Sequence, residues 1–355
     1  MVSSKPSAHL TSIDIFSGCG GLSEGMHKAG FDTKVAIEVD SIAASTFQLN
    51  HPATKVIKKD VRAVSGTEIR KELGRGTLHL LAGCPPCQGF SSVRRLNRRA
   101  PIEDERNDLL NEYVRLVVEL KPLTLMLENV AGLIGFELFN NAIETLQDVG
   151  YNWLDYDVVN VRDYGVPQRR RRLVLVGSRL GPIRVAKPEV PRKTVRQTIE
   201  DLPLPSESND PLHKIFPTHT PRIQERIELT PENGGSRGDL PPSYTLECHT
   251  DSKIGFHDIY GRLRWDDQSS TITGGCLNPS KGRFLHPTQH RCISAREAAL
   301  LQTFPPTYKF PTDISRASLA LMIGNALPPD FSYLQSKQIH DHLVQHQKTK
   351  LASAV

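Results

Sequence analysis

The first 180 residues alternate short β-rich runs with amphipathic helical patterns, and this alternation restricts the fold more than any other feature of the sequence. Apolar and β-branched residues predict strands at 12–16, 34–39, 55–57, 77–82 and 123–127. Helical patterns lie between them at 22–29, at 41–50 with Ser41 as the expected N-cap, and at 108–120. Strands that alternate with helices form mostly parallel sheets covered by helices. We therefore predict an α/β protein with a doubly wound, mostly parallel sheet.

The pattern changes after about residue 180. Residues 181–290 are rich in Pro, Gly, Ser and Thr, and short β-like pieces replace the regular alternation, which predicts a smaller, irregular domain. Regular structure returns at Ser294, which forms a capping-box pattern with Glu297, and a last helix is expected at about 329–345. We predict a main domain built from 10–180 and 291–346, a second domain at 181–290 and a flexible tail at 347–355.

Composition excludes several classes of protein. No uncharged apolar run approaches the roughly 18 residues that span a bilayer, and the polar start has no apolar signal-peptide core. Six cysteines in 355 residues do not form a disulfide framework. Hydrophobic residues make up 38% of the chain, which is enough for a packed core. We therefore expect a cytoplasmic globular protein with reduced thiols and no membrane contact.

Positive charge gathers in one segment. Residues 160–200 contain eleven Lys or Arg against three Asp or Glu, a local charge of +8, whereas the whole chain carries +5. Such a block attracts a polyanion, although a solvated face with carboxylate partners would have the same composition. Four consecutive arginines lie inside the segment. In an extended strand Arg170 and Arg172 would share one face, and Arg169 and Arg171 the other.

A glycine-rich turn joins the first predicted strand to the first predicted helix, in the stretch Asp-Ile-Phe-Ser-Gly-Cys-Gly-Gly at 14–21. Glycines let a ligand approach the backbone, and a helix start offers free N–H groups. Ser23 stands where a dinucleotide fingerprint needs its third glycine, which argues against NAD. Phe16, Glu38 and Asp60 lie at the ends of successive strands and would suit an adenosine-bearing ligand. The alternative is a plain tight turn beside solvated acids.

A second turn follows the fourth predicted strand, with the sequence Gly-Cys-Pro-Pro-Cys-Gln-Gly-Phe-Ser at 83–91. Cys84 and Cys87 have CxxC spacing, but neither a second CxxC nor a close His pair completes a zinc site, and the turn lies deep in the chain for a thioredoxin-like pair. A nucleophilic thiolate and a structural cysteine are the two main open interpretations, and a metal ligand is the third. The arginines that follow, at 94, 95, 98 and 99, form either a loop that closes over an anionic substrate or a solvated loop.

Glu128 ends the fifth predicted strand, which is apolar. A carboxylate buried at a strand end is costly unless it pairs, so we expect it either to hold a proton or to pair with an arginine. Because ligands of doubly wound sheets bind outside the carboxyl ends of the strands, one rim should bring together Phe16, Glu38, Asp60, Cys87 and Glu128.

Six stretches and two single acidic residues, taken in chain order, together resemble the cytosine-5 DNA methyltransferases. They are Asp-Ile-Phe-Ser-Gly-Cys-Gly-Gly-Leu-Ser at 14–23, Glu38, Asp60, Gly-Cys-Pro-Pro-Cys-Gln-Gly-Phe-Ser at 83–91, Glu-Asn-Val at 128–130, Val-Pro-Gln-Arg-Arg-Arg-Arg at 166–172, Arg-Glu-Ala-Ala-Leu-Leu-Gln-Thr-Phe-Pro at 296–305 and Gly-Asn-Ala-Leu-Pro at 324–328. The resemblance implies a Rossmann-like methyltransferase sheet in the catalytic domain, with 181–290 as a smaller, irregular target-recognition domain. It also implies transfer of a methyl group from S-adenosylmethionine, leaving S-adenosylhomocysteine, to C5 of a cytosine in duplex DNA.

The resemblance further implies roles for individual residues. Cys87 would attack C6 of the target cytosine, Glu128 would contact N3 and the exocyclic amine, and Arg172, supported by Arg170, would bind O2. The residues expected at the cofactor are Phe16, Gly18, Gly20, Gly21, Leu22, Glu38, Val39, Asp60, Val61, Pro86, Leu109 and Asn325. The residues expected at DNA are Ser91, Ser92, Arg94, Arg95 and Arg169, and no metal is expected.

The residue types suit this chemistry. C6 of cytosine is a poor electrophile, which favours a thiolate over a hydroxyl, and a stacked base must be flipped out before it can react. The resemblance implies double-stranded DNA as the partner, and we expect a monomer in a bacterial cytoplasm, with a cognate restriction endonuclease as a functional counterpart. The rivals are a tRNA cytosine-5 methyltransferase, a catalytically inert DNA-binding regulator and an NAD-dependent oxidoreductase. The Pro/Gly-rich insertion argues against the tRNA enzyme. An inert regulator should have lost its catalytic motifs, but this chain keeps Cys87, Glu128 and Arg172. Ser23 argues against the oxidoreductase, because it interrupts the dinucleotide fingerprint.

Overall fold

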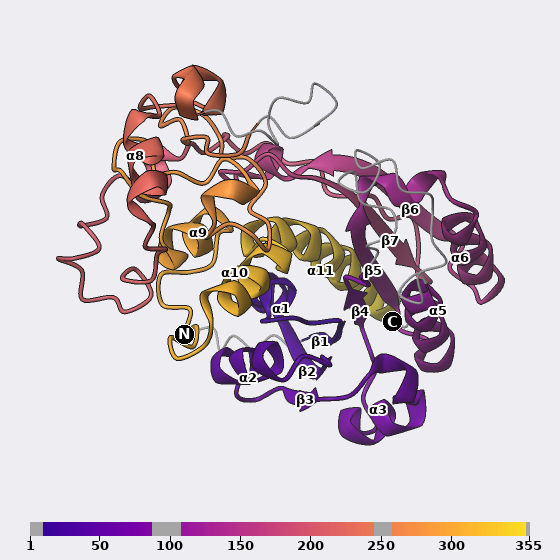
Figure 1. The fold of residues 1–355 in the computed structure, drawn as a ribbon. Coiled ribbons are helices and arrows are strands. Elements are labelled where there is room, and N and C mark those ends of the chain that lie inside the picture. Colours follow the sequence, from indigo (N-terminus) through magenta and orange to yellow (C-terminus); the bar gives the residue numbers. More distant parts are fainter. Residues whose placement is uncertain (1–9, 87–107, 245–257, 353–355) are drawn as a thin grey trace, which may run out of the picture.

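A computed structural model of the protein describes residues 10–86, 108–244 and 258–352, with side chains up to residue 349. Within these ranges one seven-stranded sheet has the order β3-β2-β1-β4-β5-β7-β6 (Figure 1). Its strands are β1 Leu10–Ile15, β2 Phe31–Ile37, β3 Lys55–Ile57, β4 Leu80–Gly83, β5 Thr124–Val130, β6 Trp153–Asn160 and β7 Arg171–Ser178. The helices that accompany them are α1 Gly21–Lys28, α2 Ser41–Asn50, α3 Gly66–Leu73, α5 Leu109–Leu120, α6 Glu137–Asp148 and α11 Pro329–Ala352.

The sheet is parallel except at one strand. β1 pairs in parallel with β2 and β4, β2 with β3, and β4 with β5. β7 runs antiparallel to both β5 and β6, because only a short 3-10 turn and a few further residues separate it from β6. The predicted α/β class and doubly wound, mostly parallel sheet are confirmed.

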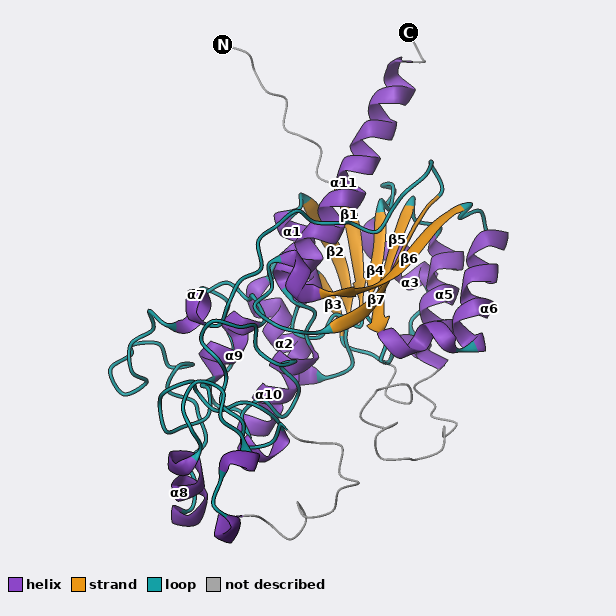
Figure 2. Cartoon of the chain, turned by 90° about the horizontal axis from the view of Figure 1, so that it is seen from above, coloured by secondary structure: helices purple, strands orange, loops and turns teal. Residues whose placement is uncertain are grey.

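Helices cover both faces of the sheet (Figure 2). On one face, Ile13, Ile15 and Leu81 pack in a buried cluster with residues of α5 and α6, including Tyr113 and Phe139. On the other, Leu80, Ala82 and Met126 pack with α1 and α11. Residues 80, 81 and 82 of β4 thus alternate between the two cores, as the period of a strand requires.

Residues after β7 form a region with little regular structure, beside the carboxyl ends of the parallel strands (Figure 1). Its helices are α7 Arg196–Ile199, α8 Pro221–Leu229, α9 Ala295–Leu301 and α10 Arg316–Asn325. One buried cluster joins Ile199, Leu263 and Phe284 to Ala298 of α9 and Ile323 of α10. The apolar core therefore crosses residue 290, and α9 and α10 pack with the irregular segment.

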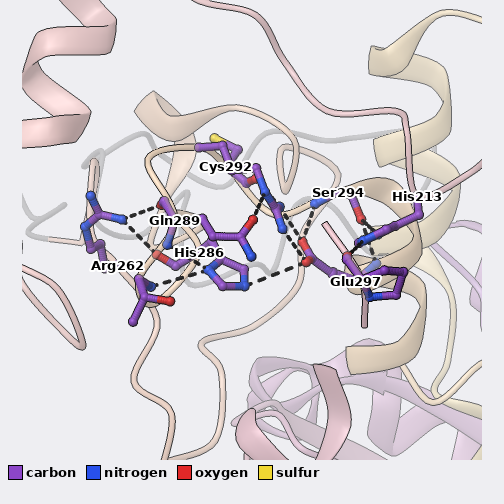
Figure 3. Close-up of polar contacts among 10 residues, drawn as sticks. His213, Arg262, His286, Gln289, Cys292, Ser294 and Glu297 are labelled. Atoms are coloured by element: carbon purple, nitrogen blue, oxygen red, sulfur yellow. Dashed lines mark hydrogen bonds and ion pairs between the residues drawn. The ribbon is translucent and has the colours of Figure 1, made fainter. Parts of the chain in front are cut away.

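A fully buried arginine holds the loops of this region together (Figure 3). Arg262 Nε donates to the carbonyl of Thr230 and Nη2 to that of Ile227, both at 2.8 Å. Its Nη1 donates to the carbonyls of His286 at 3.0 Å and Gln289 at 2.6 Å. One side chain thus satisfies buried carbonyl groups that a regular sheet would otherwise pair.

A buried ion pair lies next to this arginine at the start of α9 (Figure 3). Glu297 binds Arg291 through both carboxylate oxygens, at 2.7 and 2.8 Å, and accepts from the N–H of Ser294 at 2.6 Å. Burial alone would raise the pKa of Glu297, but the bonds to Arg291 lower it. The predicted capping box of Ser294 and Glu297 is confirmed, and Ser294 Oγ also lies 2.8 Å from His213 Nδ1.

Several local predictions differ from the structure: β2 begins at Phe31 rather than at residue 34, and β5 continues to Val130 rather than ending at residue 127. Asp40, not Ser41, is the N-cap of α2, because its carboxylate accepts from the N–H groups of residues 42 and 43. β4 begins at Leu80 rather than at residue 77. α11 continues to Ala352, so the expected tail is helical up to that residue. None of the helices in the described ranges is long and apolar enough to cross a bilayer.

Candidate active site

The carboxyl ends of the parallel strands border a cleft of about 540 Å³. Its lining comes from the ends of β1, β2, β4 and β5, from the start of β7, and from residues 271–274 and 318–327 of the irregular region. The expected cofactor residues that line it are Phe16, Gly18, Gly21, Leu22, Glu38, Val39, Asp60, Val61, Pro86, Leu109 and Asn325. Glu128, Arg170 and Arg172 line the same cleft. The predicted convergence at one rim is therefore observed for the described residues.

The glycine turn takes backbone conformations that favour glycine. Gly18 has φ +54° and Gly20 has φ +100°, and Phe16, which is not glycine, has φ +62°. Glu38 holds this turn from the neighbouring strand, since its Oε2 accepts from the N–H of Gly18 at 2.8 Å. Its Oε1 accepts from the N–H of Asp40 at 2.7 Å. Burial raises the pKa of Glu38 despite these bonds.

Gly20 is the one expected cofactor residue that does not line the cleft, and it contacts a group that the sequence did not reveal. The hydroxyl of Tyr308 donates to the carbonyl of Cys19, and His51 lies beside it. A Cβ at Gly20 would collide with Tyr308 Oη and His51 Nε2. Burial lowers the pKa of His51 to about 4, so its ring is neutral at physiological pH. Tyr308 and His51 therefore support the turn from behind.

Two acidic residues near this turn have different surroundings. Asp60 lies after β3, is exposed and accepts from the N–H of Arg62 at 2.9 Å. Asp14 is fully buried beneath the turn and accepts from Ser23 Oγ at 2.6 Å. Burial raises the pKa of Asp14 to about 7, and the bond from Ser23 offsets part of this effect. Asp60 is thus available to a ligand, whereas Asp14 belongs to the interior.

A carboxylate and a guanidinium form the other half of the cleft. Arg172 Nε lies 2.8 Å from Glu128 Oε1, which confirms the expectation that Glu128 would pair with an arginine or hold a proton. The two side chains are 17% and 8% exposed, so both are largely shielded from water yet border the cleft. The contact is an ion pair without hydrogen-bond alignment, and Glu128 Oε1 has no hydrogen-bond donor among the described residues. This oxygen has almost no exposed surface, so it belongs to the pair with Arg172 and not to the open part of the cleft.

The arginine run alternates as expected. Arg170 and Arg172 line the cleft, whereas Arg169 forms an ion pair with Asp267 at 3.1 Å and Arg171 is exposed. Burial, together with the nearby charge of Arg172, lowers the pKa of Arg170 to about 9. Arg170 Nη1 donates to the carbonyls of residues 272 and 324, at 3.2 and 2.9 Å. Its guanidinium thus bonds to protein carbonyls.

The first half of the cysteine turn lines the cleft. Cys84, Pro85 and Pro86 line the cleft, and Asn129 Nδ2 donates to the carbonyl of Pro85 at 3.0 Å, which ties the turn to the end of β5. Burial raises the pKa of the Cys84 thiol well above its usual range, so this cysteine is a poor nucleophile. The other residues predicted for this loop lie outside the described ranges: Cys87, Ser91, Ser92, Arg94 and Arg95.

No group of three or more potential metal-ligating side chains occurs in the residues for which the structure gives positions. The cleft instead offers an aromatic residue, carboxylates and two arginines. These groups suit an organic ligand with hydrogen-bonding edges.

Comparisons with known proteins identify the family. The model of the C-5 cytosine-specific DNA methylases matches residues 10–340. Type II methylase M.HgiDII of Herpetosiphon aurantiacus is 34% identical over 343 residues, which cover 92% of this chain and 94% of the relative. Type II methyltransferase M.XorII of Xanthomonas oryzae pv. oryzae is 33% identical over 352 residues, covering 89% and 81%.

Solved structures agree with this assignment at the level of the fold. A prophage-encoded DNA modification methyltransferase of Escherichia coli superposes with a TM-score of 0.70 at 24% identity, covering 94% of this chain and 99% of that one. The Dnmt2 methyltransferase of S. pombe superposes with a TM-score of 0.65 at 17% identity, with the same coverage. The chain therefore belongs to the C-5 cytosine-specific DNA methylase family and is a DNA cytosine-5 methyltransferase.

Proposed function

We propose that the protein transfers a methyl group from S-adenosylmethionine to C5 of a flipped-out cytosine in a specific duplex DNA sequence, through a transient bond between Cys87 Sγ and C6. The observation that carries the proposal is the shared cleft. The turn held by Glu38 lies at one part of its wall, and the Glu128–Arg172 pair lies at another. A methyl donor and its acceptor must meet in one such enclosed space.

The described residues fit S-adenosylmethionine, which supplies an electrophilic methyl group when it is bound. A volume of about 540 Å³ lies within the usual range for ligand sites, roughly 300–1,000 Å³. Phe16 offers its ring to the adenine, Glu38 accepts from ribose hydroxyls, and exposed Asp60 accepts from the adenine amine. Asn325 contributes from the end of α10.

The target base would lie between the cysteine turn and the Glu128–Arg172 pair. The Cys87 thiolate bonds to C6, and the electron pair of the C5–C6 double bond moves onto the ring. Glu128, in contact with N3 and the exocyclic amine, and Arg172, with a bond to O2, stabilise the charge that develops there. After C5 takes the methyl group, loss of its proton re-forms the double bond and expels the thiolate.

Duplex DNA is the proposed substrate. Phosphate contacts from Arg169 and from the basic loop at Ser91, Ser92, Arg94 and Arg95 would offset the few kcal/mol that base flipping costs. Binding should then weaken steeply with salt, because each neutralised phosphate releases counterions. The names of the curated relatives suggest a restriction–modification setting, and we propose that the chain acts as a monomer that protects DNA from a cognate endonuclease.

Bisulfite sequencing of DNA from cells that express the protein tests the activity. We expect 5-methylcytosine at one recurring sequence and none in cells without the protein. Purified protein should methylate duplex DNA and leave tRNA unmodified. Methylation of tRNA alone would overturn the choice of substrate and support the tRNA enzyme instead.

Duplex DNA with 5-fluorocytosine at the methylated position tests the covalent step, because fluorine cannot leave as a proton does. We expect a stable protein–DNA adduct with the wild type and with Cys84→Ala, and none with Cys87→Ala. Cys84 is the matched control, since it belongs to the same turn and its thiol has a raised pKa. An adduct that survives Cys87→Ala but not Cys84→Ala would assign the nucleophile to the other sulfur.

A further inference from the structure

Two buried glutamines link distant segments of the chain through a line of consecutive hydrogen bonds, in which each group donates to the next. The N–H of Ile272 donates to Gln168 Oε1 at 3.0 Å, and Gln168 Nε2 donates to Gln302 Oε1 at 2.8 Å. Gln302 Nε2 then donates to the carbonyl of Ile323 at 2.6 Å. Both side chains have no exposed surface. Because a backbone N–H can only donate and a carbonyl can only accept, each glutamine amide has one orientation that satisfies the line.

The two ends of this line lie in segments that border the cleft. At one end, residues 271–274 belong to the irregular region after β7 and line the cleft. At the other, α10 ends with Gly324 and Asn325, which also line it. Gln302 follows the last residue of α9, which packs against α10 (Figure 1).

A direct backbone contact joins the same two segments. A Cβ on Gly324 would overlap the carbonyl group of Thr273 and the nitrogen of Gly274, so the two backbones touch at this position. The carbonyl of Gly324 accepts from Arg170 Nη1 at 2.9 Å and lies 3.4 Å from Gln302 Nε2. Neither segment can shift by more than a few tenths of an ångström without the other, because buried hydrogen bonds would then be left unmade.

We propose that Gln302 is a positioning residue that couples DNA recognition to cofactor binding, which rests on the proposed function. A ligand that moves the 271–274 stretch displaces the N–H of Ile272, and the two glutamines pass this displacement to the peptide that carries Asn325. The coupling is reciprocal. The duplex strengthens binding of the cofactor by some factor, and the cofactor strengthens binding of the duplex by the same factor.

Replacement of Gln302 by methionine tests this role. Methionine has a similar length and no hydrogen-bonding amide, so the shape of the core is largely kept. The matched control is Gln335→Met, since Gln335 is equally buried but lies on α11, where its Oε1 accepts from the N–H of Ala186 at 3.0 Å. Gln168→Met breaks the same line at its other glutamine and serves as the second variant.

The measurement is the dissociation constant of S-adenosylhomocysteine, by titration calorimetry, with and without the duplex that bisulfite sequencing identifies. We expect the duplex to tighten binding by about 5–150-fold in the wild type, the usual range of coupling between sites. The ratio should fall towards one in Gln302→Met and Gln168→Met and stay at the wild-type value in Gln335→Met. A merely structural role would change the melting temperature of all three variants but would leave the ratio unchanged.

Three results would overturn the inference. The first is a ratio of one in the wild type. The second is a wild-type ratio in the folded Gln302→Met or Gln168→Met variant, and the third is a ratio in Gln335→Met that falls as far as in those two variants. Failure of the proposed function looks different. In that case the wild type would not bind S-adenosylhomocysteine, or would not methylate DNA, whatever the variants do.

Discussion

Glutamine in place of Glu38 should weaken cofactor binding, because one carboxylate shapes the glycine turn. The two oxygens of Glu38 each accept one backbone N–H, from Gly18 at 2.8 Å and from Asp40 at 2.7 Å. Glutamine offers one acceptor oxygen and places an amide donor where the other oxygen was. One of the two backbone N–H groups therefore loses its acceptor, and the remaining bond loses its charge.

The magnitude follows from these two bonds. A hydrogen bond to a charged acceptor contributes about 1.5–3 kcal/mol and a neutral one about 1 kcal/mol. Burial raises the pKa of Glu38, which shows that burying its charge is costly. The neutral glutamine avoids part of this cost, and that gain offsets some of the lost hydrogen-bond energy. We expect a net loss of about 1.4–2.8 kcal/mol in cofactor binding, a 10- to 100-fold rise in the dissociation constant.

Titration calorimetry with S-adenosylhomocysteine measures this change. Glu119→Gln is the matched control, because Glu119 Oε2 accepts from the N–H of Gly66 at 2.6 Å and does not line the cleft. Both variants should lose stability to heat, but only Glu38→Gln should lose affinity. A dissociation constant for Glu38→Gln within twofold of the wild-type value would refute the reasoning.

Three further changes have consequences that stability measurements can check. Tyr308→Phe leaves the buried carbonyl of Cys19 without its donor and should lower the free energy of unfolding by about 1–3 kcal/mol in urea titrations; no change would show that the hydroxyl is not needed. Arg262→Met leaves four carbonyls unpaired and should cost about 3–5 kcal/mol, seen as rapid proteolysis of the irregular region; wild-type resistance would contradict this. The pKa of Asp14 is raised from 3.8 to about 7, so the native state keeps a proton that the unfolded state releases. Stability should therefore fall as pH rises from about 4 to 7. Asp14→Asn should flatten this slope in melting curves, and an unchanged slope would exclude Asp14 as its source.

Local sequence patterns predict the sheet and most of the cleft. The alternation of strands and helices requires parallel strands, whose carboxyl ends lie at one edge, so residues at strand ends such as Glu38, Asp60 and Glu128 had to converge. Local patterns were less reliable at boundaries. Ser41 and Asp40 are both good capping residues, and only the backbone geometry at the start of α2 shows that Asp40 takes the role.

The residues that support the cleft could not be found in this way. Tyr308 contacts Cys19, 289 positions away, and Gln168 contacts Gln302, 134 positions away. No periodicity links such pairs, because their contact exists only after the sheet has formed and α9 and α10 have packed beside it. The residue sequence by itself determined that residues at the strand ends border one cleft, since alternating strands and helices give parallel pairing with the carboxyl ends at one edge. Only the tertiary structure decided how those groups are held, because buried hydrogen bonds depend on backbone groups that folding brings together from distant segments.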